Sequence, residues 1–436
     1  MLSVARSCTR FAPTRAILKN GFGTQSFYRT AQKSPPTSFS LRLFQRGQTQ
    51  FTQVEGLLQR TKNQSVRRAS AMGQKSQKIV GSWLLTCSGM VFVAVALGGI
   101  TRLTESGLSM VTWKFLGEKM PSGETQWIEE FERYKEYPEY KILNKGMTLE
   151  EFKKIWWMEY MHRMWGRLIG ITFALPATFF WATGMLMPAV KPRVLILGSL
   201  IGLQGLMGWY MVKSGLEDRF DGPSDIPRVS QYRLASHLGL ALLIYTGFLY
   251  NAFDHLFPAK KMDLDLFGTR NIPVKIFNGL RKFKRFVYTT KGLVFATAIS
   301  GAFVAGLDAG LIYNTFPKMS DRWIPDDLFA HKPIYRNFTE NPTMVQFEHR
   351  ILGITTLTVI TLMGLRSRKF DLPGRGSAAV KAVVCAGYLQ VFIGVTTLLY
   401  HVLVPLAAMH QSGSLILLST VTWLCHEMKH VKKIIK

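Results

Sequence analysis

The segment Trp157–Gly170 has the sequence WMEYMHRMWGRLIG and decides the fold, because it places a carboxylate, an imidazole and two guanidiniums at the start of an apolar helix. A shorter version, QFEHRILGI, occupies Gln346–Ile354 and keeps the aromatic residue, the His-Arg pair and the small residue that leads into the apolar stretch. Ionisable groups are costly inside a bilayer. Two such entries into apolar helices therefore predict that the chain binds a ligand there.

The hydrophobic residues, which make up 47% of the 436-residue chain against 19% charged residues, lie in long blocks. A hydrocarbon layer is crossed by a helix of about 20 apolar residues. Eight blocks are of that order, and they lie at 79–100, 156–187, 194–212, 234–253, 293–312, 347–365, 378–400 and 405–424. The sequence therefore predicts an all-α integral membrane protein with eight transmembrane helices.

The region before Ile79 is strongly basic, with fourteen Lys and Arg residues against the single acid Glu55, in a chain of net charge +27. It is rich in Ser, Thr and Gln and has no long apolar core. This composition is typical of a mitochondrial transit peptide, so we assign residues 1–78 to a transit peptide and basic arm. A disordered arm for nucleic acid or lipid is the alternative. The membrane spans that follow favour import, and no nucleic-acid partner is expected.

The connections between the spans differ in charge, and basic connections stay on the side from which a membrane protein is inserted. Basic residues fill 191–193, 258–291, 366–375 and the C-terminal 429–436. Acidic and aromatic loops at 124–139, 217–225 and 308–340 fall on the other side. Eight spans with both chain ends inside satisfy this pattern, and for a mitochondrial protein inside means the matrix.

The chain also repeats itself, because Glu105–Leu108 can be aligned with Asp308–Leu311 and each half continues with an aromatic residue, a His-Arg pair and a later histidine. Four spans per half keep the two copies in the same orientation, related by an axis along the membrane normal. We therefore expect two pseudo-symmetric four-helix bundles, at 79–257 and 292–436, joined by a basic matrix linker at 258–291.

Four of the nine histidines lie in apolar spans at matching places: His162 and His349 near the start of the second helix of each half, and His237 and His410 near the start of the fourth. Two imidazoles at similar depth on two helices of one bundle are what axial ligation of a haem iron needs. A lone membrane histidine is more often a packing residue, and zinc or copper would want a richer ligand set. The remaining five are predicted to be solvated or interfacial, namely His255, His331, His401, His426 and His430.

The residues around these histidines differ between the halves. Arg163 and Arg350 follow their histidines in both, and they could pair with haem propionates or extend to the lipid headgroups. Glu159 lies three residues before His162, on the same helical face, whereas Gln346 holds the matching place before His349. A carboxylate beside the iron can move protons, so Glu159 is the predicted catalytic residue. An ion pair between Glu159 and Arg163 is the alternative.

The chain resembles the haem A synthase family, in its mitochondrial form involved in cytochrome oxidase assembly, over residues 80–429. The resemblance rests on G-G-x-T-R-L-T-x-S-G-L-S at 98–109, E-Y-x-H-R at 159–163, His237, E-H-R at 348–350 and H-Q at 410–411. It implies haem b held by His349, His410 and Arg350, and the substrate haem O held by His162, His237 and Arg163. It also implies stepwise oxidation of a haem O ring methyl to a formyl group, which gives haem A, with Glu159 as the catalytic carboxylate.

The same resemblance implies an inner-membrane location and a mitochondrial ferredoxin as the electron donor, with haem O synthase and a second copy of the chain as further candidate partners. Two other functions stay open on the residues alone. A bis-His cytochrome b-type electron-transfer protein would hold two similar haems and tolerate loss of Glu159. A haem transporter would need a path across the bilayer, which ligand pairs on one side do not suggest.

Overall fold

The computed structural model describes residues 73–114, 116–217, 227–258 and 274–430, and in this part the chain is helical. Nearly all of the predicted presequence lies outside the described residues. Among the described residues the one strand-like feature is an isolated bridge between Met319 and Arg322. The prediction of an all-α protein is thus confirmed.

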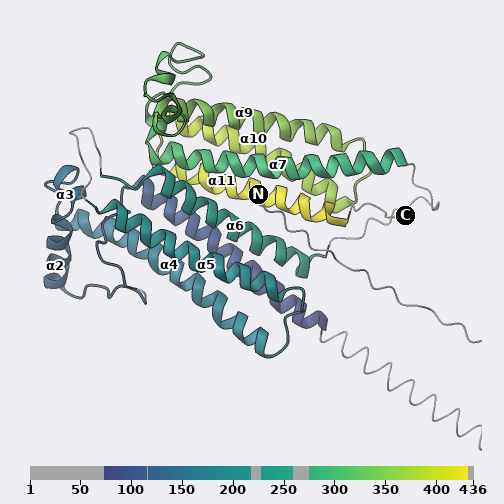
Figure 1. Cartoon of the computed structure of the whole chain (residues 1–436), viewed down its shortest axis with the longest axis horizontal. Helices are drawn as coiled ribbons and strands as arrows, with labels where there is room; N and C mark the ends of the chain where they lie inside the picture. The colour runs from purple at the N-terminus through teal and green to yellow at the C-terminus, as the bar shows by residue number, and fades with distance from the viewer. Residues whose placement is uncertain (1–72, 115, 218–226, 259–273, 431–436) are drawn as a thin grey trace, which may run out of the picture. The chain divides into compact units, whose positions relative to one another are not determined.

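Eight of the described helices are long (Figure 1). They are Gly73–Leu103, α4 (Leu149–Ala182), α5 (Lys191–Gly215), α6 (Gln231–Leu256), α7 (Val274–Gly306), α9 (Pro342–Ser367), α10 (Gly374–Leu399) and α11 (Val404–Glu427). Each contains or overlaps one predicted span. The largest difference is at α7, which begins at Val274 instead of near Leu293, so much of the expected basic linker is helical.

Six of these helices are long and apolar enough to cross a membrane: Gly73–Leu103, α5, α6, α10, α11 and the part of α7 from Asn278 to Gly306. The other two, α4 and α9, have similar lengths but carry the two His-Arg entries. Glu159, Arg163 and Arg167 lie in α4, and Glu348 and Arg350 lie in α9. The same polar residues that mark the entries thus separate these two helices from the rest.

The helices that carry the entries have well-defined starts. At α4 the Thr148 side chain accepts a hydrogen bond from the Glu151 backbone N–H, and the Glu151 carboxylate accepts one from the Thr148 N–H, which forms a capping box. At α9 the Asn341 side chain accepts from the Thr343 N–H, and Pro342 is the first helical residue. These caps satisfy backbone groups that would otherwise be orphaned at the first turn.

Helix contacts define which elements pack together. The helix Gly73–Leu103 packs on α4, because the Trp83 indole donates to the Thr172 carbonyl at 2.9 Å and the Trp165 indole donates to the Met90 carbonyl at 2.8 Å. Further along the chain α5 packs on α4 and α6, and α7, α9, α10 and α11 pack on one another. The two sets meet where α6 contacts α7 and α11.

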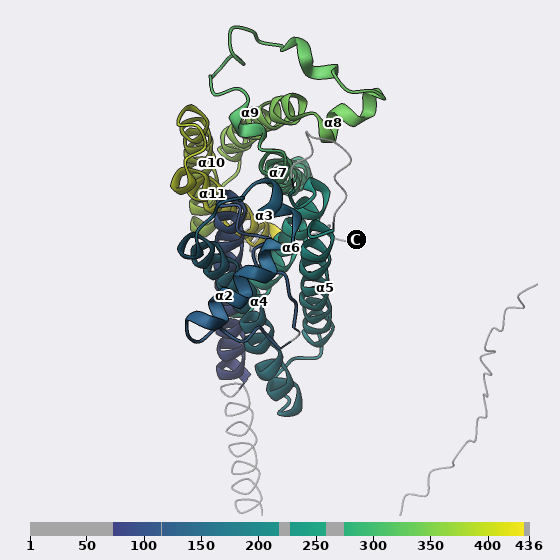
Figure 2. The same cartoon turned by 90° about the vertical axis from the view of Figure 1, so that its left-hand side faces the viewer.

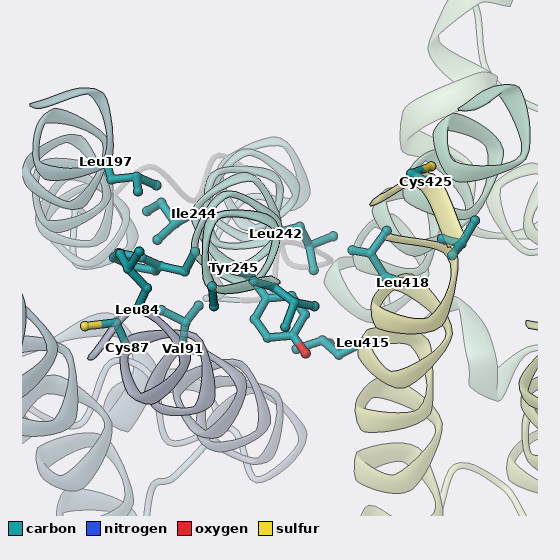
Figure 3. Close-up of a cluster of buried hydrophobic side chains, with 14 of the residues drawn as sticks. Leu84, Cys87, Val91, Leu197, Leu242, Ile244, Tyr245, Leu415, Leu418 and Cys425 are labelled. Atoms are coloured by element: carbon teal, nitrogen blue, oxygen red, sulfur yellow. The ribbon is translucent and has the colours of Figure 1, made fainter. Parts of the chain in front are cut away.

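The apolar core runs through this meeting place (Figure 3). Leu242 and Tyr245 of α6 point towards Leu415 and Leu418 of α11, and the Tyr245 hydroxyl lies 2.6 Å from the Ser419 hydroxyl. Burying such side chains contributes about 1.5–3 kcal/mol each. The contact between the two sets of helices is therefore an apolar core with one internal polar pair.

The loop that follows the first helix of each set adopts the same unusual backbone. Glu105 has φ of 50° and Asp308 has φ of 52°, both in the left-handed region, and the next residue, Ser106 or Ala309, is fully buried. Figure 2 faces this end of the molecule, with α2 (Glu124–Lys135), α3 (Pro138–Ile142) and α8 (Asn337–Glu340). The alignment of these two loops from sequence is thus matched in the backbone.

Candidate functional site

One cavity of about 1990 Å³ is lined by all four membrane histidines that the sequence singled out. Ligand pockets are typically about 300–1,000 Å³, so this cavity has room for more than one small ligand or for a large flat one. Its walls are mainly apolar, and its polar groups include Glu159, Arg163 and Arg350. The candidate residues from both halves of the chain therefore face connected space.

Each of the four histidines lies with its Cε1 atom against a glycine of another helix. A Cβ atom built on that glycine would come closer to Cε1 than ordinary van der Waals contact of about 3.5–4 Å. The pairs are Gly98 with His162 (2.9 Å), Gly208 with His237 (3.2 Å), Gly301 with His349 (3.3 Å) and Gly394 with His410 (2.6 Å). The repetition of this contact four times means that both halves position their imidazoles by one device.

The C-terminal histidines, His349 on α9 and His410 on α11, face each other with ring centroids 6.4 Å apart and ring planes at 90°. A ligating imidazole nitrogen lies about 2 Å from its metal and about 1 Å from its own ring centre, so two axial rings have centres about 6 Å apart. Nδ1 of His349 is hydrogen-bonded to the Ser300 hydroxyl at 2.7 Å, and Nδ1 of His410 lies 3.1 Å from Nε2 of Gln390. Both Nε2 atoms are left for a metal.

The N-terminal histidines are held differently. Gln204 of α5 donates to the His237 carbonyl at 3.1 Å and places the same nitrogen 3.3 Å from Nε2 of His237. In the described part of the chain, Nδ1 of His162 and Nδ1 of His237 are buried without hydrogen-bond partners. Buried polar atoms are normally satisfied. The N-terminal pair therefore lacks the fixed orientation that Ser300 gives to its C-terminal counterpart.

Glu159 is 2% exposed and accepts hydrogen bonds at both carboxylate oxygens. Oε1 receives Nε and Nη2 of Arg163 at 3.0 and 2.6 Å, and Oε2 receives the Ser109 hydroxyl and the Met110 N–H, each at 2.8 Å. Arg163 also donates to the carbonyls of Met110 and Thr112 at 2.7 Å. The ion pair expected as the alternative exists, and it ties the first outer loop to α4.

Gln346 and Arg350 form the corresponding arrangement on α9. Gln346 Oε1 accepts from Arg350 Nη2 at 3.0 Å, while Gln346 Nε2 donates to the carbonyls of Ala309 at 2.6 Å and Tyr313 at 3.2 Å. Arg350 donates to the carbonyls of Tyr313 and Thr315 at 2.8 and 2.9 Å. Each arginine is therefore occupied by loop carbonyls, and a contact to a ligand carboxylate would have to replace or add to these bonds.

Comparison with known proteins places the chain in a family. Residues 81–422 match the family model described as "Cytochrome oxidase assembly protein". The chain belongs to this family. It is 53% identical over 365 residues to Heme A synthase COX15 of Homo sapiens, which covers 84% of this chain and 86% of the relative. The Arabidopsis thaliana protein of the same name is 46% identical over 82% of this chain and 76% of the relative. A Schizosaccharomyces pombe protein named Heme A synthase-mitochondrial ferredoxin fusion protein is 41% identical over 81% of this chain and 61% of the relative.

In this family member, sequence reasoning missed the two glutamines that touch the histidines of α6 and α11. The signal was present, because Gln204 precedes Gly208 by four residues and Gln390 precedes Gly394 by four residues. Residues four apart share a helical face. A search for duplicated polar residues, extended from histidines to glutamines, would have found both.

Two of the five histidines predicted to be solvated or interfacial are buried, so that prediction is wrong for them. His426 is fully buried, with Nε2 3.0 Å from Oδ1 of Asp254, and Nδ1 of the 8%-exposed His255 lies 2.8 Å from the Asn251 carbonyl. Both lie where α6 and α11 end, in a polar network that the apolar pattern of those helices conceals. His331 and His401 are exposed as predicted, and the side chain of His430 lies outside the described ones.

Proposed function

We propose that this chain is a haem A synthase, which oxidises a ring methyl of haem O to a formyl group and so supplies haem A for cytochrome c oxidase. The observation that carries this is an asymmetry inside a duplicated site. Two histidine pairs share one cavity, and the carboxylate Glu159 accompanies one of them while the amide Gln346 accompanies the other. Relatives that bear the name Heme A synthase match more than four-fifths of the chain.

The membrane arrangement that supports this function has all eight long helices crossing the mitochondrial inner membrane as two four-helix bundles. In it, α4 and α9 cross with their ionisable groups turned to the cavity and the loops, where Glu159, Arg163 and Arg350 make the bonds described above. The basic connections place the N- and C-termini in the matrix. Protease accessibility of tags at the two ends of the chain, in mitoplasts, would test the orientation.

The C-terminal pair fits a resident haem b. The ring separation of 6.4 Å suits two axial ligands, and the bond from Ser300 to Nδ1 leaves Nε2 of His349 for the iron. Bound there, the haem would supply one-electron transfer. His349 and His410 would hold it, with Arg350 near its carboxylates.

The N-terminal pair, His162 and His237, then holds the substrate haem O, with Arg163 beside it. Glu159 is the residue that we assign to the reaction, because it is the carboxylate that this half has and the other half lacks. Its bonds to Arg163, Ser109 and Met110 hold it as an anion. A fixed negative charge of this kind stabilises positive charge that develops on a substrate as it is oxidised.

A ferredoxin is the electron donor that we propose, and one relative is named as a fusion with a mitochondrial ferredoxin. The N-terminal part of α7 offers a basic surface, where Lys282 and Arg285 are exposed. Charge complementarity speeds the encounter of such partners. Reversing both charges to Glu should slow reduction by ferredoxin at low salt, and an unchanged rate at every salt concentration would remove this partner surface.

The test of the function is extraction and chromatography of the haems bound to the purified protein. The wild type should contain haem b together with haem O or haem A, and Glu159→Gln should contain haem b and haem O without haem A. Haem b alone in both proteins would contradict the synthase and favour a cytochrome b-type carrier. Glu132→Gln, an exposed carboxylate of α2, is the matched control and should behave as the wild type.

A further inference from the structure

A second buried carboxyl group lines the same cavity. Glu139 of α3 is 5% exposed and lies in the first outer loop, and it forms no ion pair with a Lys or Arg in the described part of the chain. A buried carboxyl group without a cation is costly in its charged form. Structural carboxylates of this loop do have such partners, as Glu132 does with Lys135. Glu139 therefore needs a reason other than charge pairing.

The contacts of Glu139 fix one of its oxygens and leave the other. The Tyr134 hydroxyl donates to Oε2 at 3.1 Å, and the Asn144 side-chain amide donates to the same hydroxyl at 2.7 Å. Tyr134 itself is fully buried, stacked on Phe152 at 5.1 Å between ring centroids. Oε1 has no hydrogen-bond partner among the described residues. The rigid side of Glu139 is thus the one turned to the loop, and Oε1 remains available to the cavity.

The surroundings of Glu139 keep it protonated at neutral pH. Burial raises the pKa of Glu139 to about 8, the negative charge of Glu159 on α4 raises it further, and the Tyr134 hydrogen bond from α2 acts in the opposite direction. Glu105, in the loop after the first helix, adds a smaller upward shift to this pKa. These are the titratable groups that face Glu139 from the elements packed around it. Glu139 is thus a neutral acid next to a fixed anion.

The two carboxyl groups of the cavity are therefore suited to different tasks. Glu159 has both oxygens occupied by Arg163, Ser109 and Met110, so protonating it would break an ion pair and oppose two donors. Glu139 can gain or lose a proton at Oε1 without breaking any hydrogen bond. Environments that push two carboxyl groups apart in this way commonly separate acid-base work from electrostatic work.

We propose that Glu139 is the group that exchanges protons with the reacting centre of this cavity, that Tyr134 positions it, and that Glu159 serves as the fixed charge. This inference rests on the proposed haem A synthase function, since oxidation of a methyl group to a formyl group must move protons. The step itself is acid-base only: an O–H bond of Glu139 breaks as an O–H bond forms on water or substrate oxygen, or the reverse, and no oxidation state changes.

The first experiment needs no turnover and uses the full-length purified protein. Infrared spectra taken against pH should show a protonated-carboxyl C=O band that is sensitive to D₂O and disappears with a midpoint near pH 8. The band should be absent from Glu139→Gln and present in Glu132→Gln. Tyr134→Phe should move the midpoint upwards, because the hydrogen bond that lowers the pKa is lost. Persistence of the whole band in Glu139→Gln would overturn the assignment.

The second experiment is the pH profile of haem A formation. The wild type should show a titration limb near pH 8, and Glu139→Gln should lose that limb and turn over roughly 100-fold more slowly, in the range of general acid-base catalysis. Bound haem O should stay at the wild-type level, and Glu139→Asp should restore a displaced limb. A wild-type profile in Glu139→Gln would refute the inference. A wild type that makes no haem A would refute the proposed function instead, while the infrared midpoint would still decide the protonation of Glu139.

Discussion

The two His-Arg entries differ in the residue three positions before the histidine and in the residue that faces the imidazole. On α4 the carboxylate of Glu159 accepts from backbone and hydroxyl donors, and on α9 the amide of Gln346 donates to backbone carbonyls. Ser300 is hydrogen-bonded to His349, whereas Leu97 holds the matching place, one residue before Gly98, in the first half. One half is built to hold its imidazole still, and the other to present a charge.

The largest expected effect separates the two pairs by what they keep. His410→Ala should remove haem b from the purified protein, because a bis-His site loses an axial ligand. His237→Ala should retain haem b and lose haem O. Quantifying each haem by chromatography distinguishes the two, and His401→Ala, an exposed histidine, is the control. Equal loss of both haems from both variants would mean that the halves are not specialised.

A substitution at the glycine behind a histidine tests the shared positioning device. Gly394→Ala places a Cβ 2.6 Å from Cε1 of His410, so the ring must move and haem b occupancy should fall severalfold. Gly353→Ala, on α9, meets nothing within 4 Å and should leave occupancy unchanged. The ratio of haem absorbance to protein measures both variants. Full occupancy in Gly394→Ala would show that the ring is free to adjust.

Exchanging the amide for a carboxylate at the second entry tests whether the loops are matched to their partners. Gln346→Glu turns two hydrogen bonds to the carbonyls of Ala309 and Tyr313 into contacts between acceptors. We expect a loss of about 1–3 kcal/mol in the free energy of unfolding, measured as a lower thermal midpoint. The substitution should not produce a second site of haem O oxidation. An unchanged midpoint would contradict the donor role of Gln346.

The smallest effect is expected from the hydroxyl behind His349. Ser300→Ala removes the hydrogen bond to Nδ1, which contributes about 1 kcal/mol and raises the basicity of the ligand. Haem b should stay bound, and its midpoint potential in a spectroelectrochemical titration should rise. Leu97→Ser in the other half is the reciprocal change. If both variants have the wild-type potential, the difference between the halves lies elsewhere.

Much of the fold follows from the one-dimensional pattern. Runs of apolar residues predicted each long helix, and the loop alignment at Glu105 and Asp308 correctly paired two left-handed residues. The start of α7 at Val274 was missed because basic residues support a helix beyond a membrane as well as they support a loop. His426 was misjudged for a related reason: its partner Asp254 lies on another helix.

The sequence by itself determined the helices, the repeat and the four histidines, because spacing along one helix is a local property that residue types record. Only the tertiary structure decided what those residues touch: that Glu159 is tied to Ser109 and Met110, that Ser300 is hydrogen-bonded to His349, and that Glu139 lines the same cavity. Hydrogen bonds and burial depend on partners brought together by packing from distant parts of the chain. The chemistry of each carboxyl group depends on those partners, so it could not be inferred from the residue alone.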